Sequence, residues 1–299
     1  MPSKKKESNE SKLIYIPFVA VVIIAAAFFV LPLLHSSSST QTASSSNIQT
    51  VSLSTNKPFF QFAKVSNENY AGNDSVQVYF ISWYGCPYGA SDSWALYIAL
   101  SKFGLLNVTP NYSDLEAIPS TTGTIEGKVP GLIFNSFVPK SNVYFHAIYL
   151  LGRIFPSNST ASLTNGTIIS YSGNSLVNLE LNELKKLAPS WVYNLVYEYQ
   201  IQTVFPQGGA PIAYLGHPPH IASTIIITGP NGTWMLIGYD QQINPGAPGL
   251  LAQYASLSNY SPSVPEQLLQ NIQEGTIPPS LEFIKQEANQ ISNIIQEAM

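Results

Sequence analysis

Cys86 is the residue whose type and surroundings point most directly to chemistry. It is the only cysteine among the 299 residues, and it lies between an apolar run, 76–83, and a helix-like segment, 89–103. At such a junction, backbone N–H groups and the helix dipole stabilise a thiolate. Pro87 suits the first helical turn, where no N–H donor is needed. The pattern predicts a nucleophilic or redox-active thiol; the alternative is a small residue that fits a tight turn.

Gly89 stands where a second cysteine would complete a dithiol pair with Cys86. One thiol cannot both attack a disulfide and resolve the mixed disulfide that results, so a complete dithiol–disulfide cycle within the chain is excluded. The chemistry that remains is a mixed disulfide, a persulfide or sulfenic acid, or a bridge to another chain. We expect Pro87, Tyr88 and Gly89 to contact any ligand that approaches the thiol.

Asp92 and the segment 217–220 contain the other side chains that could act with Cys86. Asp92 either points into the core beneath the thiol, where a carboxylate could accept its proton, or occupies a solvated helix position. We expect Pro219 and His220 to approach Cys86, with Pro219 and Pro211 ranked above Pro218 as the proline packed against the cysteine turn. A Cys–His pair is a nucleophile arrangement; the alternative is that these are ordinary loop histidines. His217 and His220 with Cys86 could also form a metal site, although we expect no metal and no cofactor.

Strands and helices alternate along the part of the chain that must position these residues. The run 76–83 predicts a strand buried on both faces, and Gly104 is expected to end the helix that follows. Further strands are predicted at 59–65, on both sides of a turn within 129–151, and in a hairpin at 224–239. The fold class is therefore α/β, with a central mixed sheet flanked by helices, insertions and a C-terminal helical extension.

Helical spacing continues into the second half of the chain. Residues 176–187 predict one helix, and 191–205 fits either a strand or a helix. Ser263 and Glu266 have the spacing of a capping box, which predicts a helix start. A helix that begins at Pro279 carries apolar residues every three or four positions, so it packs on the domain or on a partner. The polar stretch 156–173 is predicted to be an exposed loop.

The N-terminal segments indicate where the domain lies. Residues 1–12 carry four lysines, and residues 13–34 contain no charge. A span of about 20 apolar residues crosses a bilayer as a helix. We therefore expect an uncleaved single-pass anchor with a cytoplasmic N-terminus; the alternative is a cleaved signal peptide. Residues 35–57 are rich in Ser and Thr and predict a linker, so the extracellular domain spans 58–299.

The composition fits a protein of the cell surface. Only 10% of residues are charged and the net charge is −4, and no basic patch follows the anchor, so nucleic acid is not an expected partner. A single cysteine cannot form an internal disulfide. Asn-x-Ser/Thr sequons beyond the anchor predict glycosylation. They begin at Asn73, Asn107, Asn111, Asn158, Asn165, Asn231 and Asn259.

The segment 86–104 resembles the thioredoxin-like family catalogued as domain of unknown function 929. The matching residues are Cys86, Asp92, Trp94 and the ending Ser101, Lys102, Phe103 and Gly104. The sequence departs from the family pattern at Gly89, where the family has its second cysteine, and at Ser93, where it has an arginine. The resemblance covers roughly 60–299 and is strong only in this segment. It implies a thioredoxin-like fold, and it implies no activity because the function of the family is not established.

These observations leave three functions open. The first is a membrane-anchored extracellular module, without dithiol oxidoreductase activity, that binds a surface partner or has a structural role. The second is a monothiol enzyme or redox sensor that uses Cys86. The third is an envelope accessory protein whose fold supports glycans. The sequence names no small-molecule ligand.

Overall fold

The computed structural model describes residues 57–114, 116–120, 123–154 and 159–299. Within these ranges, no helix has the length and apolar character that a membrane span requires. The predicted cytoplasmic segment 1–12, the predicted anchor 13–34 and the predicted linker up to residue 56 lie outside the described residues.

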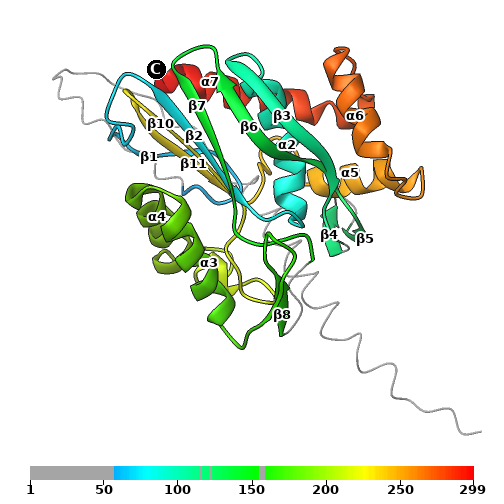
Figure 1. Cartoon of the computed structure of the whole chain (residues 1–299), viewed down its shortest axis with the longest axis horizontal. Helices are drawn as coiled ribbons and strands as arrows, with labels where there is room; N and C mark the ends of the chain where they lie inside the picture. Colours follow the sequence, from blue (N-terminus) through cyan, green and yellow to red (C-terminus); the bar gives the residue numbers. More distant parts are fainter. Residues whose placement is uncertain (1–56, 115, 121–122, 155–158) are drawn as a thin grey trace, which may run out of the picture. The chain divides into compact units, whose positions relative to one another are not determined.

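A five-stranded mixed sheet forms the centre of the domain (Figure 1). Its strand order is β1-β11-β10-β2-β7, in which β2 and β7 are parallel and the other neighbours are antiparallel. The strands are β1 (Ala63–Ser66), β2 (Val76–Ser82), β7 (Val143–Tyr149), β10 (Thr224–Gly229) and β11 (Gly232–Ile237). The α/β class with a central mixed sheet and flanking helices is confirmed.

Helices cover both faces of this sheet, which explains why β2 is almost entirely apolar. Successive side chains of a strand point to opposite faces. Val78 and Phe80 belong to the same core cluster as residues of α2 (Pro87–Leu100) and α7 (Phe283–Ala298). Tyr79 and Ile81 belong to the cluster formed with α3 and α4 on the other face.

The remaining elements surround these two layers. The helices are α3 (Ser175–Leu187), α4 (Ser190–Tyr197), the π-helix η3 (Glu198–Gln202), the short 3-10 turns η4 (Ile212–Tyr214) and η5 (Pro279–Leu281), α5 (Ala247–Ser256) and α6 (Val264–Gln273). Three two-stranded sheets are formed by β3 (Gly104–Tyr112) with β6 (Pro130–Pro139), β4 (Glu116–Ser120) with β5 (Gly123–Gly127), and β8 (Thr160–Ser162) with β9 (Ile168–Ser170).

Helix α7 packs on the domain, which is the first of the two alternatives predicted for it. The residues of its apolar stripe are all fully buried, and they are Ile284, Ala288, Ile291, Ile295 and Ala298. They join the core between α2 and the sheet. Burying one such aliphatic side chain contributes roughly 1.5–3 kcal/mol, so the stripe holds the C-terminal helix against α2.

Gly104 does not end α2 as predicted, because the helix stops at Leu100 and Gly104 is the first residue of β3. A Cβ atom at Gly104 would lie 2.4 Å from the ring of Phe137. The glycine therefore allows β3 and β6 to approach each other. The two strands predicted within 129–151 exist, but β6 pairs with β3 and β7 pairs with β2 instead of with each other.

Three further predictions differ from the structure in detail. The first strand begins at Ala63 and not at residue 59, because Phe60 adopts a left-handed φ of 54°. The stretch 156–173 contains the β8–β9 hairpin. The helix start predicted at Ser263 is confirmed, because α6 begins at Val264, but Ser263 makes no side-chain capping bond, and its hydroxyl bonds to that of Ser261 at 2.9 Å.

Candidate functional site

Cys86 is the N-cap residue of α2, at the point where the chain leaves β2. Its Sγ accepts a hydrogen bond from the backbone N–H of Gly89 at 3.4 Å, and Pro87 follows in the first helical turn. Gly85 makes the turn before it possible, since a Cβ there would lie 1.9 Å from the carbonyl oxygen of Arg153. The cysteine is 3% exposed, so the thiol has an N-cap environment but little contact with solvent.

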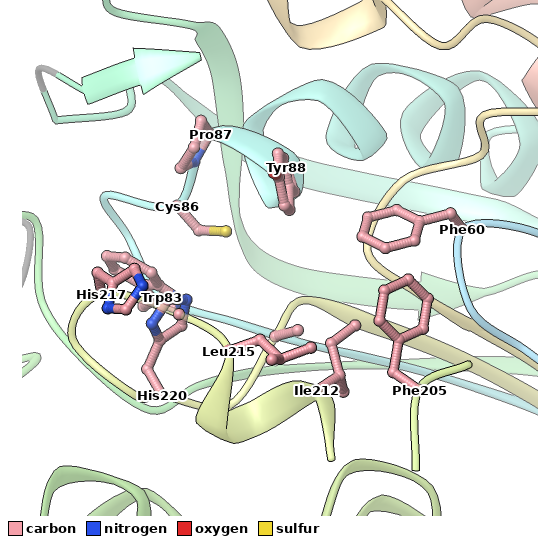
Figure 2. Close-up of a pocket in the computed structure, with 12 residues that line it drawn as sticks. Phe60, Trp83, Cys86, Pro87, Tyr88, Phe205, Ile212, Leu215, His217 and His220 are labelled. Carbon is pink, nitrogen blue, oxygen red and sulfur yellow. The ribbon is translucent and has the colours of Figure 1, made fainter. Parts of the chain in front are cut away.

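A cavity of about 240 Å³, here called the thiol cavity, lies beside Cys86 (Figure 2). Three separate parts of the chain form its walls: Phe60, the β2–α2 junction, and the segment 205–222. Its side chains are mainly aromatic and aliphatic: Phe60, Trp83, Tyr88, Phe205, Ile212 and Leu215, with His217 and His220 on one side. Of the residues predicted to surround the thiol, Pro87, Tyr88 and His220 line this cavity, and Gly89 and Pro219 do not.

Aromatic contacts fix the shape of the thiol cavity. The rings of Phe60 and Phe205 meet edge to face with centroids 5.8 Å apart, and Phe60 meets Tyr88 at 6.3 Å. On the opposite wall, Trp83 and His220 meet at 5.2 Å. Such edge-to-face pairs add roughly 0.5–1.5 kcal/mol each beyond the area they bury. The walls are therefore formed before any ligand arrives.

His220 contributes a neutral imidazole to the thiol cavity. Burial lowers its pKa, and this effect outweighs the hydrogen bond of Nδ1 with the carbonyl oxygen of Pro218, which raises the pKa. That bond is 2.7 Å long. Because a carbonyl oxygen can only accept, the proton of the neutral ring is assigned to Nδ1, and Nε2 keeps its lone pair. The ring can therefore accept a proton or a hydrogen bond at Nε2.

The loop that carries His220 includes the one cis peptide bond of the described residues, between His217 and Pro218. The sequence-based ranking, which placed Pro219 and Pro211 above Pro218, was wrong. The cis bond lies in the segment that faces Cys86 across the thiol cavity. It precedes Pro218, the first of the two adjacent prolines Pro218 and Pro219.

Two buried polar side chains hold the end of this loop, and neither was predicted as a site residue. Glu180 of α3 accepts a hydrogen bond from the N–H of Ile221 at 2.8 Å. Gln200 of η3 accepts from the N–H of Ala222 at 2.8 Å and donates to its carbonyl oxygen at 3.1 Å. Burial raises the pKa of Glu180 well above its ordinary range. A glutamate on the same helical face as apolar residues was the available signal for Glu180.

Asp92 is fully buried, so of the two alternatives predicted for it the core position is correct and the solvated position is wrong. Its pKa is raised well above the usual range, first by burial and then by Glu287 of α7 and Asp240 of the segment after β11. These are the charged groups that act on it, and Cys86 is not among them. The proposed role of Asp92 as a proton acceptor for the thiol therefore has no support in this geometry. It belongs instead to a carboxyl cluster formed by Asp92, Asp240 and Glu287.

No group of three or more His, Cys, Asp or Glu side chains within the described ranges could hold a metal ion. The thiol cavity offers one thiol, two histidines and aromatic and aliphatic surfaces. This arrangement can bind an apolar group next to the sulfur, and it can form a single covalent bond to that sulfur.

The predicted glycosylation sites differ in accessibility. Five of them are exposed: Asn73, Asn107, Asn165, Asn231 and Asn259. Asn158 lies outside the described residues. Asn111 is 4% exposed, and its side-chain amide donates to the carbonyl oxygen of Tyr84 at 2.8 Å. A sugar on this nitrogen would have to occupy space that the protein fills.

We therefore expect Asn111 to remain unmodified in folded protein made in a glycosylating host, whatever the state of the exposed sequons. Glycopeptide mass spectrometry after proteolysis measures occupancy at each asparagine. Asn107, which is exposed on the same strand, is the matched comparison within the chain. Full occupancy at Asn111 in soluble folded protein would contradict the burial of this side chain.

Comparison with known proteins supports the family and nothing finer. No curated protein and no solved structure matches the chain. A family model matches residues 61–297, which include β2, Cys86, the thiol cavity and α7. The chain therefore belongs to the family described as Domain of unknown function (DUF929).

Proposed function

We propose that the protein is a thioredoxin-like binding module, held outside the cell by a membrane anchor at 13–34, and that it has no dithiol oxidoreductase activity. The observation that carries the proposal is the thiol cavity, whose walls are mostly apolar and whose single cysteine is 3% exposed. A surface pocket of this kind binds a ligand or a group of a surface partner. With Gly89 in place of a second thiol, the same location cannot complete a redox cycle.

The thioredoxin-like assignment rests on the order of the elements around Cys86. A buried strand, β2, leads into the cysteine at the start of α2, and a later strand, β7, lies parallel to β2. The antiparallel hairpin β10–β11 follows, and β10 pairs with the other edge of β2. The β3–β6 ribbon is an insertion between α2 and β7.

A monothiol enzyme or sensor is the second candidate, and the N-cap geometry of Cys86 favours it. A helix N-terminus lowers the pKa of a thiol, whereas apolar surroundings raise it. The sulfur accepts the N–H of Gly89, which stabilises a thiolate, but it is also buried in an apolar cluster with Trp83 and Leu151. Because Cys86 is only 3% exposed, a disulfide substrate has little access to its sulfur, and the binding module is the better supported of the two.

The two candidates differ in the reactivity of Cys86. We expect the full-length protein to show no catalytic reduction of insulin, and native Cys86 to react with iodoacetamide more slowly than the same residue in urea. Turbidity measures insulin reduction, and intact mass measures alkylation against time and pH. Cys86→Ser is the control for labelling elsewhere. Labelling of the native protein that is fast at neutral pH and slowed by unfolding would favour the monothiol enzyme.

The membrane topology is testable in cells. Lysines precede the predicted anchor, which places the N-terminus in the cytoplasm and the domain outside. Protease added to intact cells is expected to cut the linker and release the domain, while an epitope tag at the N-terminus stays protected until the cells are permeabilised. A domain that is protected in intact cells and cut only after permeabilisation would refute this orientation.

A further inference from the structure

The thiol cavity excludes charge. Of the residues that line it, none is Lys, Arg, Asp or Glu. The side chains with titratable groups are those of Cys86, Tyr88, His217 and His220, and burial favours the neutral form of His220. A charged ligand would lose its hydration without gaining an opposite charge, and this costs far more than transferring a neutral group. The lining therefore selects an uncharged ligand.

The volume of the thiol cavity limits the size of that ligand. Pockets for drug-sized molecules and cofactors usually measure about 300–1,000 Å³, and this one measures about 240 Å³. A nucleotide, a flavin or a folded peptide loop does not fit inside it. One ring system, free or attached to a longer molecule that remains outside, does.

The walls determine which shape is favoured. Figure 2 shows Phe60 and Phe205 on one side of the opening and Trp83 with His220 on the other, with Leu215 and Ile212 between them. Rings placed in this way can meet a guest ring edge to face, the arrangement that aromatic pairs prefer. The hydrogen bonds that Glu180 and Gln200 accept from the N–H groups of Ile221 and Ala222 hold the loop, so little order has to be gained on binding.

We propose that the thiol cavity binds a single uncharged aromatic ring, either as a small molecule or as the side chain of a peptide, with the ring in contact with Phe60, Phe205 and Leu215 beside the sulfur of Cys86. This proposal rests on the proposed binding function, because it names the class of ligand for the same cavity. It adds the requirements that the ligand be neutral, aromatic and no larger than one ring system.

The experiment uses the full-length protein in detergent micelles and four probes of similar size. Indole and toluene are neutral, whereas benzoate and benzylamine are charged at pH 7. Saturation-transfer NMR detects binding, and the alkylation rate of Cys86 reports occupancy next to the sulfur. We expect indole and toluene to bind and to slow alkylation at least fivefold at saturation. The charged probes are expected to bind at least tenfold more weakly.

Substitutions at Leu215 test whether the probes bind in the thiol cavity. Leu215→Trp fills the cavity and is expected to abolish both the NMR signal of binding and the slowing of Cys86 alkylation by the probes. Leu215→Phe adds less volume and serves if the tryptophan variant does not fold; it is expected to weaken both effects. Leu257→Trp is the matched control, because Leu257 is 81% exposed, and it should behave like the wild type. N-acetyl-phenylalaninamide and N-acetyl-leucinamide, compared with the free rings, show whether a peptide side chain is accepted and whether the ring matters.

The possible failures are distinguishable. Equal binding of benzoate or benzylamine, lost in the Leu215 variants, would refute the neutral ligand class and leave the binding module intact. Preference for the leucine amide over the phenylalanine amide and the free rings would refute the aromatic requirement. Binding of neutral rings that the Leu215 variants do not weaken would place the site elsewhere and overturn the proposal. Failure of every probe to bind or to protect Cys86 would overturn the proposed function as well.

Discussion

Raising the pH from about 5 to 9 is expected to destabilise the wild-type domain by several kcal/mol, and Glu287→Gln is expected to remove most of that loss. The reason is the carboxyl cluster of Asp92, Asp240 and Glu287, which lies between α2, α7 and the segment after β11. All three side chains are at most 3% exposed. Within the described residues, no ion pair joins these carboxyl groups to a lysine or an arginine.

Asp92 and Glu287 both favour the protonated form near neutral pH, because burial raises the pKa of each. Asp92 is hydrogen-bonded to Glu287, and this bond raises the pKa of Asp92 and lowers that of Glu287. No N–H or hydroxyl group of the described residues donates to either oxygen of Asp92. A bond between two carboxyl groups needs a proton on one of them, and the directions of the two shifts place it on Asp92 as the donor.

The sign of the pH dependence follows from the shifts. Burial and the neighbouring Asp240 raise the pKa of Glu287 from 4.5 to about 8, and burial also raises the pKa of Asp240. A carboxyl whose pKa is raised in the folded state contributes stability that is fully present below the unfolded pKa and is lost as the pH rises towards the folded pKa. The window is therefore pH 4.5 to about 8. One proton costs about 1.4 kcal/mol per pH unit, so the loss across this whole window is on the order of 5 kcal/mol.

Urea unfolding at pH 5, 7 and 9 measures this slope. Glu297→Gln is the matched control, because Glu297 lies on the same helix in an exposed position and should leave the slope unchanged. Asp92→Asn tests the hydrogen-bond partner of Glu287 and should also flatten the curve. If Glu287→Gln has the same pH slope as the wild type, Glu287 does not hold a proton at neutral pH.

Strong local patterns explain which parts of the fold were predictable. The apolar run that became β2, the helical spacing of α2 and α7, and the glycine turn between β10 and β11 each depend on neighbours in the sequence. The β3–β6 ribbon depends on pairing between distant segments. The strand signal in β3, where half-buried residues such as Leu106 and Val108 alternate with exposed ones, was overlooked. Its first residue, Gly104, was therefore interpreted as the end of a helix.

The same contrast between local and distant segments explains which site residues could be predicted. Cys86, Pro87 and Tyr88 were predictable because a strand, a turn and a helix place them in one short segment. Phe60 and Phe205 reach the cavity from loops far away in the sequence, and no local pattern marks them. Asp92 was placed in the core as one of two alternatives, but its partner Glu287 is on the last helix, so the cluster depends on the packing of α7.

Gly89→Ala is expected to destabilise the domain by about 1–3 kcal/mol, although alanine is the better helix former by up to about 1 kcal/mol. A Cβ at this position would lie 2.0 Å from the Oγ of Ser82 and 3.3 Å from Cζ of Phe80. The position therefore points into the packed contact between α2 and β2. The hydroxyl of Ser82 is buried without a hydrogen-bond partner among the described residues, so Ser82→Ala should cost little or nothing.

The variant that restores a second thiol follows from the same contact. Residues 86 and 89 are an N-cap and a first-turn residue, a separation at which a disulfide can close. We expect Gly89→Cys alone to fold poorly, because its side chain meets Ser82, and we expect Gly89→Cys with Ser82→Ala to fold and to form a disulfide under mild oxidant. Urea unfolding compares the four proteins of the cycle, and intact mass after alkylation counts free thiols. Ser82→Ala is the control for the loss of the hydroxyl.

Two outcomes would contradict this reasoning. A Gly89→Cys variant as stable as the wild type would show that the glycine is not required by packing. A stable double variant that never closes its disulfide would contradict the geometry of the turn.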